Sequence, residues 1–201
     1  MNGDLKADSI LSAEYAYIAQ TAFQANEDRA KVSTFYVLTV GSFLAAMLGL
    51  QTDILQIQLI YLAFIILFAI LSLNAALTLL QLVRLRQAWY DSVQALNQLK
   101  SYYVAHTGEQ PLAGAFRWDS GTLPAMFKPW SVSFLLALQV TILGGAALGA
   151  TLVFAGLAAL DNPNIWLWVL SAFVGLLYAA ALVALYWYLL RGKGRGEEDE
   201  A

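Results

Sequence analysis

Apolar residues recur near the start of the chain at intervals that place them on one face of a helix. Between residues 11 and 32 the intervals alternate between four and three residues. This is the heptad spacing of a helix that packs lengthwise on another helix. The stripe consists of Leu11, Tyr15, Ile18, Ala22, Ala25, Arg29 and Val32. It enters the uncharged segment 32–50 without a linker, which predicts one helix that reaches a membrane and continues into it.

Four segments meet the requirement of about 20 mostly apolar residues for crossing a bilayer. They are 32–50, 57–82, 132–157 and 165–190, and none contains Asp, Glu, Lys, Arg or His. The connections 51–56 and 158–164 are short, so each pair of spans is expected to form an antiparallel hairpin.

A second stripe follows the second span. Its residues are Leu82, Leu85, Trp89, Val93, Leu96, Leu99 and Tyr103. They predict an amphipathic continuation over 83–104, with Gly108 as a candidate C-terminal cap. The two stripes run in opposite chain directions, so we expect them to pack antiparallel as a stalk under the bundle.

The remaining segments have other compositions. In 110–130, three prolines and two glycines alternate with aromatic residues, which excludes a regular helix and predicts an ordered lid along the membrane interface. Residues 191–201 join a basic stretch to four consecutive acidic residues, which is typical of a disordered charged tail.

Composition and charge fix the class and the orientation. The 201 residues are 60% hydrophobic and 12% charged, with a mean hydropathy of +0.61, values outside the range of ordinary soluble domains. All 11 Lys and Arg lie before the first span, between the second and third, or after the fourth. The positive-inside rule then predicts an inner-membrane protein with both termini in the cytoplasm. Aromatic anchors are expected at the outer interface (Tyr61, Trp166, Trp168) and the inner one (Phe35, Tyr36, Trp130, Tyr186, Trp187, Tyr188).

The predicted fold class is therefore an all-α integral membrane protein. Its four transmembrane helices form an up-down bundle, with two cytoplasmic amphipathic helices and an interfacial lid loop. The expected organisation is an N-terminal helix (1–31), a first hairpin (32–82), a cytoplasmic helix and lid (83–130), a second hairpin (131–190) and the tail (191–201).

Little in the sequence indicates catalysis. There is no cysteine, which excludes disulfides, thiolate metal sites and cysteine nucleophiles. His106 is the sole histidine and is interpreted as a solvated helix-end residue. Without a phosphate loop or an acid pair, we expect no enzyme activity, no cofactor and no metal. The net charge of −3 gives nucleic-acid binding no support.

Three sets of residues are candidates for function. Glu27, Asp28, Arg29 and Lys31 form a charged cluster at the entry to the first span; salt bridges are favoured there over cation binding. Asn74 and Gln139 are costly to bury in lipid, and contact with a neighbouring helix is favoured over a pore lining. Gly145, Gly149 and Gly175 lie in small-residue patterns that let helices approach closely. Packing within one chain is favoured for them, and a subunit interface is the alternative.

The charged cluster carries a family resemblance. The segment 24–33, followed by Gly41 and Ser42, resembles the entry to the first span in small bacterial membrane effectors of the SLATT and Pycsar transmembrane type. The resemblance covers about 35 residues and implies a segment that couples a cytoplasmic helix to the membrane bundle. This chain departs from the two-span form of SLATT by its second hairpin, and it lacks a recognisable cyclic-nucleotide-sensing domain.

The leading hypothesis is a non-enzymatic membrane protein that oligomerises and perturbs or permeabilises the inner membrane when its stalk is engaged. The alternative is a scaffold or accessory subunit of a larger membrane complex, and a small-solute transporter ranks third. The expected partners are the lipid bilayer and either further copies of the chain or other membrane subunits.

Overall fold

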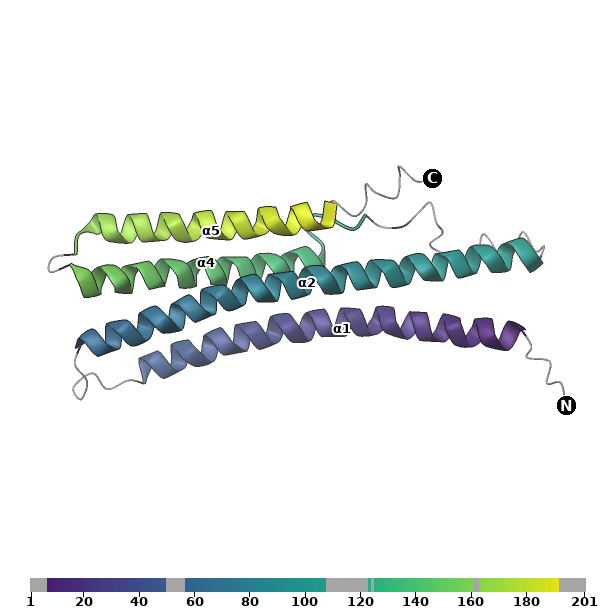
Figure 1. Cartoon of the computed structure of the whole chain (residues 1–201), viewed down its shortest axis with the longest axis horizontal. Helices are drawn as coiled ribbons and strands as arrows, with labels where there is room; N and C mark the ends of the chain where they lie inside the picture. The colour runs from purple at the N-terminus through teal and green to yellow at the C-terminus, as the bar shows by residue number, and fades with distance from the viewer. Residues whose placement is uncertain (1–6, 50–56, 108–122, 124, 161–162, 192–201) are drawn as a thin grey trace.

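Four long helices make up the described part of the chain. The computed structural model describes residues 7–49, 57–107, 123, 125–160 and 163–191. Within these ranges the regular structure is α1 (Ala7–Leu48), α2 (Ile57–Thr107), α4 (Val132–Ala159) and α5 (Ile165–Arg191), with no strand (Figure 1). All four helices are long and apolar enough to cross a membrane. The predicted all-α class with four candidate spans is therefore confirmed for these residues.

α1 and α2 extend well beyond the predicted spans, whereas α4 and α5 do not. α4 and α5 begin at Val132 and Ile165, where the hydropathy pattern places them. α1 and α2 have 42 and 51 residues because the apolar stripes continue the same helices. The two expected amphipathic helices are thus not separate elements. Most of the predicted lid (110–122 and 124) and the tail from 192 onward lie outside the described residues.

The helices alternate in direction and pack in the order α1, α2, α4, α5 (Figure 1). α2 contacts both α1 and α4, whereas α1 and α5 lie at the two edges. We call residues 7–31 of α1 and 83–107 of α2 the stalk, and the four-helix region the bundle. The stalk extends past the ends of α4 and α5, so four helices become two at this level (Figure 1).

Polar caps fix the starts of α4 and α5. The Ser131 hydroxyl accepts a hydrogen bond from the Phe134 amide at 3.3 Å. The Asn164 side chain accepts one from the Trp166 amide at 3.0 Å. Both bonds satisfy amides that have no partner within their own helix. The hydropathy pattern and the cap chemistry therefore agree on where these helices begin.

Small residues bring the bundle helices into close contact. A β-carbon on Gly144 would overlap the side chain of Ala75 on α2. A β-carbon on Gly145 would lie 2.5 Å from the backbone oxygen of Gly175, and the reverse substitution is equally tight. Gly149 is next, at 3.1 Å from the Ser171 oxygen. Backbone contact of this kind is how membrane helices associate without a hydrophobic driving force.

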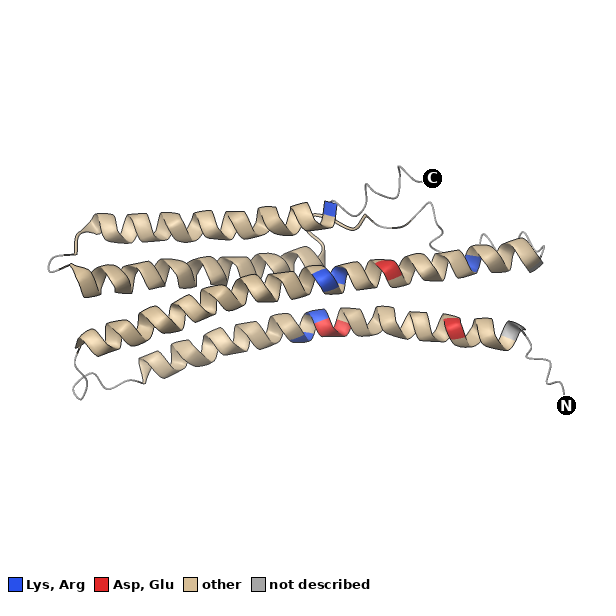
Figure 2. Ribbon diagram, viewed as in Figure 1, with Lys and Arg blue, Asp and Glu red and all other residues tan. Residues whose placement is uncertain are grey.

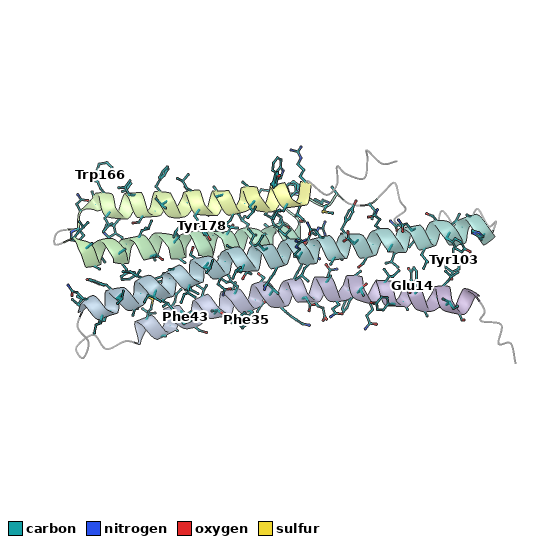
Figure 3. The ribbon with its side chains drawn as sticks, viewed as in Figure 1. Glu14, Phe35, Phe43, Tyr103, Trp166 and Tyr178 are labelled. Carbon is teal, nitrogen blue, oxygen red and sulfur yellow. The ribbon has the colours of Figure 1, made fainter. Side chains whose placement is uncertain are left out.

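The aromatic residues divide into core and surface. Trp130, Trp166 and Tyr188 are exposed, and Trp166 projects from the far end of α5 (Figure 3). Tyr36 and Tyr186 are buried instead, so their prediction as interfacial anchors is wrong. The Tyr36 hydroxyl donates to the Leu71 carbonyl at 3.3 Å. The prediction of interfacial anchors uses only the residue type and its depth along the span. Whether the ring is buried depends on which face of the helix carries it.

We predict that Gly175→Ala weakens the bundle, because its new methyl group meets the backbone of α4. Overpacking of this kind costs about 1–3 kcal/mol. Gly41→Ala is the matched control, since nothing lies within 4 Å of its β-carbon position. The measurement is the fraction of folded protein against increasing SDS in mixed micelles, followed by tryptophan fluorescence. Equal midpoints for the two variants would contradict this packing.

Candidate functional site

Basic residues gather at the junction, which is the level where α4 begins, α5 ends and α1 and α2 continue as the stalk. Figure 2 shows Lys and Arg of α1, α2 and α5 at this level. The residues concerned are Arg29, Lys31, Arg84, Arg86 and Arg191. On the bundle side of the junction, the four spans contain no Asp, Glu, Lys, Arg or His. Just outside the uncharged spans, α1, α2 and α5 therefore each carry at least one cation.

Arg86 fastens the segment before α4 onto α2. Its side chain is 7% exposed. The Nε donates to the Met126 carbonyl at 3.0 Å, and a terminal nitrogen donates to the Ala125 carbonyl at 3.2 Å. The guanidinium carbon also lies 4.4 Å from the centre of the Trp89 ring, within cation–π range. One side chain thus holds residues 125–126 against α2.

Arg29 approaches the same place from α1. Its side chain is 6% exposed, and a terminal nitrogen donates to the Ser133 hydroxyl on α4. Its guanidinium carbon lies 6.0 Å from the Trp89 ring centre. The Nε is buried without a hydrogen-bond partner. Arg29 therefore links α1 to α4 while keeping one donor unsatisfied.

Burial disfavours the charge of both arginines. Burial lowers the pKa of Arg29, and the nearby charge of Arg86 lowers it further. Burial also lowers the pKa of Arg86, while Tyr186 and Tyr90 oppose the change. Among the described residues, no carboxylate forms an ion pair with either guanidinium. Two buried positive charges without a counter-charge are unfavourable, so this level favours an anion.

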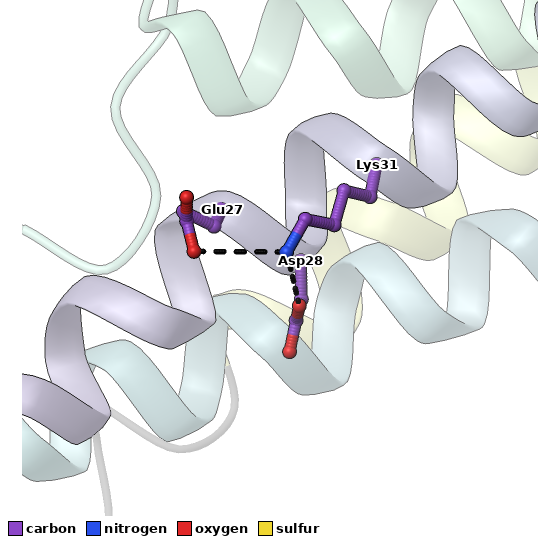
Figure 4. Close-up of polar contacts among 3 residues, drawn as sticks. All are labelled: Glu27, Asp28 and Lys31. Atoms are coloured by element: carbon purple, nitrogen blue, oxygen red, sulfur yellow. Dashed lines mark ion pairs between the residues drawn. The ribbon is translucent and has the colours of Figure 1, made fainter.

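The rest of the charged cluster faces outward. The Lys31 ammonium lies 3.6 Å from a Glu27 carboxylate oxygen and 3.7 Å from one of Asp28 (Figure 4). All three side chains are substantially exposed, and exposed pairs of this spacing contribute about 0.3–0.5 kcal/mol. The four residues named from the sequence thus divide, with Arg29 pointing inward and the other three forming a local surface network.

Gln87 links α2 to α5 at the junction. Its amide nitrogen donates to the Leu189 carbonyl of α5 at 3.4 Å. Its oxygen accepts from Arg84 at 3.4 Å. Gln87 thus links α2 to α5, Arg29 links α1 to α4, and Arg86 links α2 to the segment just before α4.

The stalk helices lie against each other along part of the predicted stripes, whereas Tyr15 of the α1 stripe is 40% exposed. Ala22 and Ala25 of α1 and Val93 of α2 are buried. The hydroxyl oxygens of Thr21 and Ser92 lie 3.3 Å apart. Arg86 and Asn97 are also buried on α2 but were not predicted from the sequence. Their spacing was the available signal: Leu82, Arg86, Trp89 and Val93 step by four, three and four residues, just as the α1 stripe passes through Arg29.

The two amide side chains in the candidate spans have different surroundings. Asn74 is half-buried on α2, whereas Gln139 is exposed on α4. Among the described residues neither side chain has a hydrogen-bond partner. Gln139 lines a groove of about 420 Å³ between α1 and α4. The groove is otherwise apolar: Val37, Leu135, Leu138, Ile142 and Leu143.

The remaining candidate is His106, at the end of the stalk. It is exposed, with a ring nitrogen 2.9 Å from the Tyr102 carbonyl and its ring stacked on Tyr102 at 4.0 Å. In the described part of the chain no cluster of three or more His, Asp or Glu could hold a metal.

Comparison with protein-family models, with curated proteins and with solved structures gives no match. The resemblance of segment 24–42 to SLATT and Pycsar effectors therefore stays a prediction.

We predict that Arg86→Ala frees the segment before α4, because two carbonyls lose their donors. Losing about 1.4 kcal/mol of docking energy raises the open population about tenfold. Chymotrypsin cleavage after Phe127 should accelerate by about that factor. Arg84→Ala is the control, since Arg84 is exposed on the same helix and among the described residues forms a hydrogen bond with Gln87 alone. Equal cleavage rates in the two variants would contradict the docking role.

Proposed function

We propose that this chain is a non-enzymatic inner-membrane protein whose cytoplasmic stalk controls how far its bundle perturbs or permeabilises the membrane. The observation that carries the proposal is the continuity of α1 and α2. Each helix runs unbroken from the stalk into a candidate span. The basic residues at the junction support the cytoplasmic placement of the stalk.

Because α1 and α2 are continuous, a movement of the stalk can be transmitted to the bundle. Neither α1 nor α2 contains a proline, the commonest cause of a sharp kink. A rotation or tilt of the stalk would therefore turn the α1 and α2 spans. Arg29, Arg86 and Gln87 pass the movement on to α4 and α5. A partner that engages the stalk would thus alter the packing of all four helices.

Gln139 supports self-association within the same proposal. An amide that faces lipid without a partner is unfavourable, and a second copy of the chain can satisfy it. The Gln side chain both donates and accepts, so two copies related by a two-fold axis can pair Gln139 with Gln139. The groove between α1 and α4 leaves room for this contact.

The same groove also favours the second candidate function, a scaffold or accessory subunit. In that case a helix of a different membrane protein would supply the partner for Gln139. The two proposals differ in whether the purified chain associates with itself and whether it permeabilises vesicles alone.

We predict that a disulfide across the stalk blocks activity. In Thr21→Cys/Ser92→Cys the sulfurs would replace oxygens that lie 3.3 Å apart, and the chain has no other cysteine. The measurement is dye release from vesicles containing the purified protein. Oxidation should slow release about tenfold or more, because the disulfide fixes α1 against α2 in the stalk and prevents the movement that the proposal requires.

Reduction of the disulfide should restore release, and each single cysteine variant should be insensitive to oxidant. Vesicles that lose dye equally fast in both redox states would contradict control by the stalk. Vesicles that release no dye in either state would contradict membrane perturbation itself.

We further predict that Gln139→Leu reduces self-association by about three- to thirtyfold, in line with about 0.6–2 kcal/mol for a hydrogen bond between membrane helices. Energy transfer between labelled copies in vesicles measures the association. Asn74→Leu is the control, because Asn74 is half-buried and outside the groove. Self-association that survives Gln139→Leu unchanged would place the interface elsewhere.

A further inference from the structure

A second groove lies between α1 and α2 at the junction and takes no part in the proposed coupling. Its volume is about 650 Å³. Its polar lining residues are Asp28, Lys31, Gln81 and Arg84, and its apolar ones are Val32, Leu77, Leu80 and Leu85. Both helices contribute, so the groove depends on the packing of α1 on α2.

The lining residues follow a gradient along the helices. On α2, Leu77 and Leu80 belong to the uncharged span, whereas Arg84 lies in the stalk. On α1, Val32 begins the span and Lys31 lies just outside it. The groove is thus apolar on the bundle side and charged on the stalk side. This order suits an amphiphile whose head lies at the membrane surface and whose chain lies in the bilayer.

The charges at this level favour an anionic head. The turns 27–31 and 84–86 carry four cations and two carboxylates, and Lys31 alone pairs with both carboxylates. Arg84 is exposed, and among the described residues it donates to the neutral Gln87 amide and pairs with no carboxylate. Arg29 and Arg86 do not line the groove but lie in the same turns, and neither forms an ion pair with a carboxylate of the described residues. The Arg29 Nε is buried without a hydrogen-bond partner. Two positive charges therefore remain in excess.

We propose that this groove binds an anionic phospholipid of the inner leaflet. Arg84 and Lys31 contact the phosphate, and one acyl chain lies along Leu77 and Leu80. Basic sites between membrane helices bind lipid head groups in this way. The inference rests on the proposed placement of the junction at the cytoplasmic membrane surface, and it needs neither self-association nor membrane perturbation.

The test is native mass spectrometry of the full chain released from nanodiscs. The nanodiscs contain phosphatidylglycerol or phosphatidylcholine with identical acyl chains. We expect retained phosphatidylglycerol on the wild-type chain and much less phosphatidylcholine. Arg84→Gln should lower retention of phosphatidylglycerol about fivefold, since one cation near a head group contributes about 1 kcal/mol. Lys128→Gln removes one exposed cation outside the groove and should have little effect.

A second variant separates the groove from general surface charge. Leu80→Trp fills the apolar part and leaves every charge in place, so it should lower retention as Arg84→Gln does. Equal retention of the two lipids, unchanged retention in both groove variants, or an equal loss in Lys128→Gln would each overturn the proposal. Displacement of the lipid by millimolar inorganic phosphate would also overturn it, because the site would then select a soluble anion.

A negative lipid result is distinguishable from failure of the proposed function. The disulfide across the stalk tests membrane perturbation without reference to bound lipid, so either proposal can stand when the other falls.

Discussion

Arg29 and Arg86 lie buried beside Trp89 at the level where four helices become two, and no carboxylate of the described residues pairs with either of them. A guanidinium group remains charged at any physiological pH and is costly in hydrocarbon. The two side chains must therefore stay at the edge of the bilayer. In the proposed placement, this requirement sets the depth of α1 and α2 in the membrane and the boundary between bundle and stalk.

The same two residues connect what lies on either side of that boundary. Through Ser133 and the carbonyls of residues 125 and 126 they hold the start of α4 against α1 and α2. Beyond this level α4 and α5 meet through glycine backbones, which leaves little freedom for independent movement. α1 has no such contact at Gly41 and lies at the edge of the row. Movement of the stalk is thus expected to displace α1 first, beside the groove that contains Gln139.

The sequence predicts the positions of the helices more accurately than it predicts which of their side chains are buried. Hydropathy places the starts of α4 and α5 at Val132 and Ile165, because long uncharged segments have one interpretation in a membrane protein. The stripe on α1 correctly includes Arg29. The burial of Arg86 was missed because the predicted α2 stripe runs from Leu82 to Trp89 through the apolar Leu85 and not through Arg86. The burial of Tyr36 and the exposure of Gln139 depend on which helices are neighbours, which periodicity within one helix does not determine.

The most direct test of the account is a spin-label scan along the outer face of α1 in lipid bilayers. Single cysteines at exposed positions from Gln24 to Leu38 are the label sites, and the chain has no native cysteine to remove. The account predicts water access at Glu27, contact with lipid at Phe35 and an unbroken helical period across Arg29. A period that breaks near Arg29, or water access that persists at Phe35, would contradict a continuous helix that leaves the membrane at the arginine level.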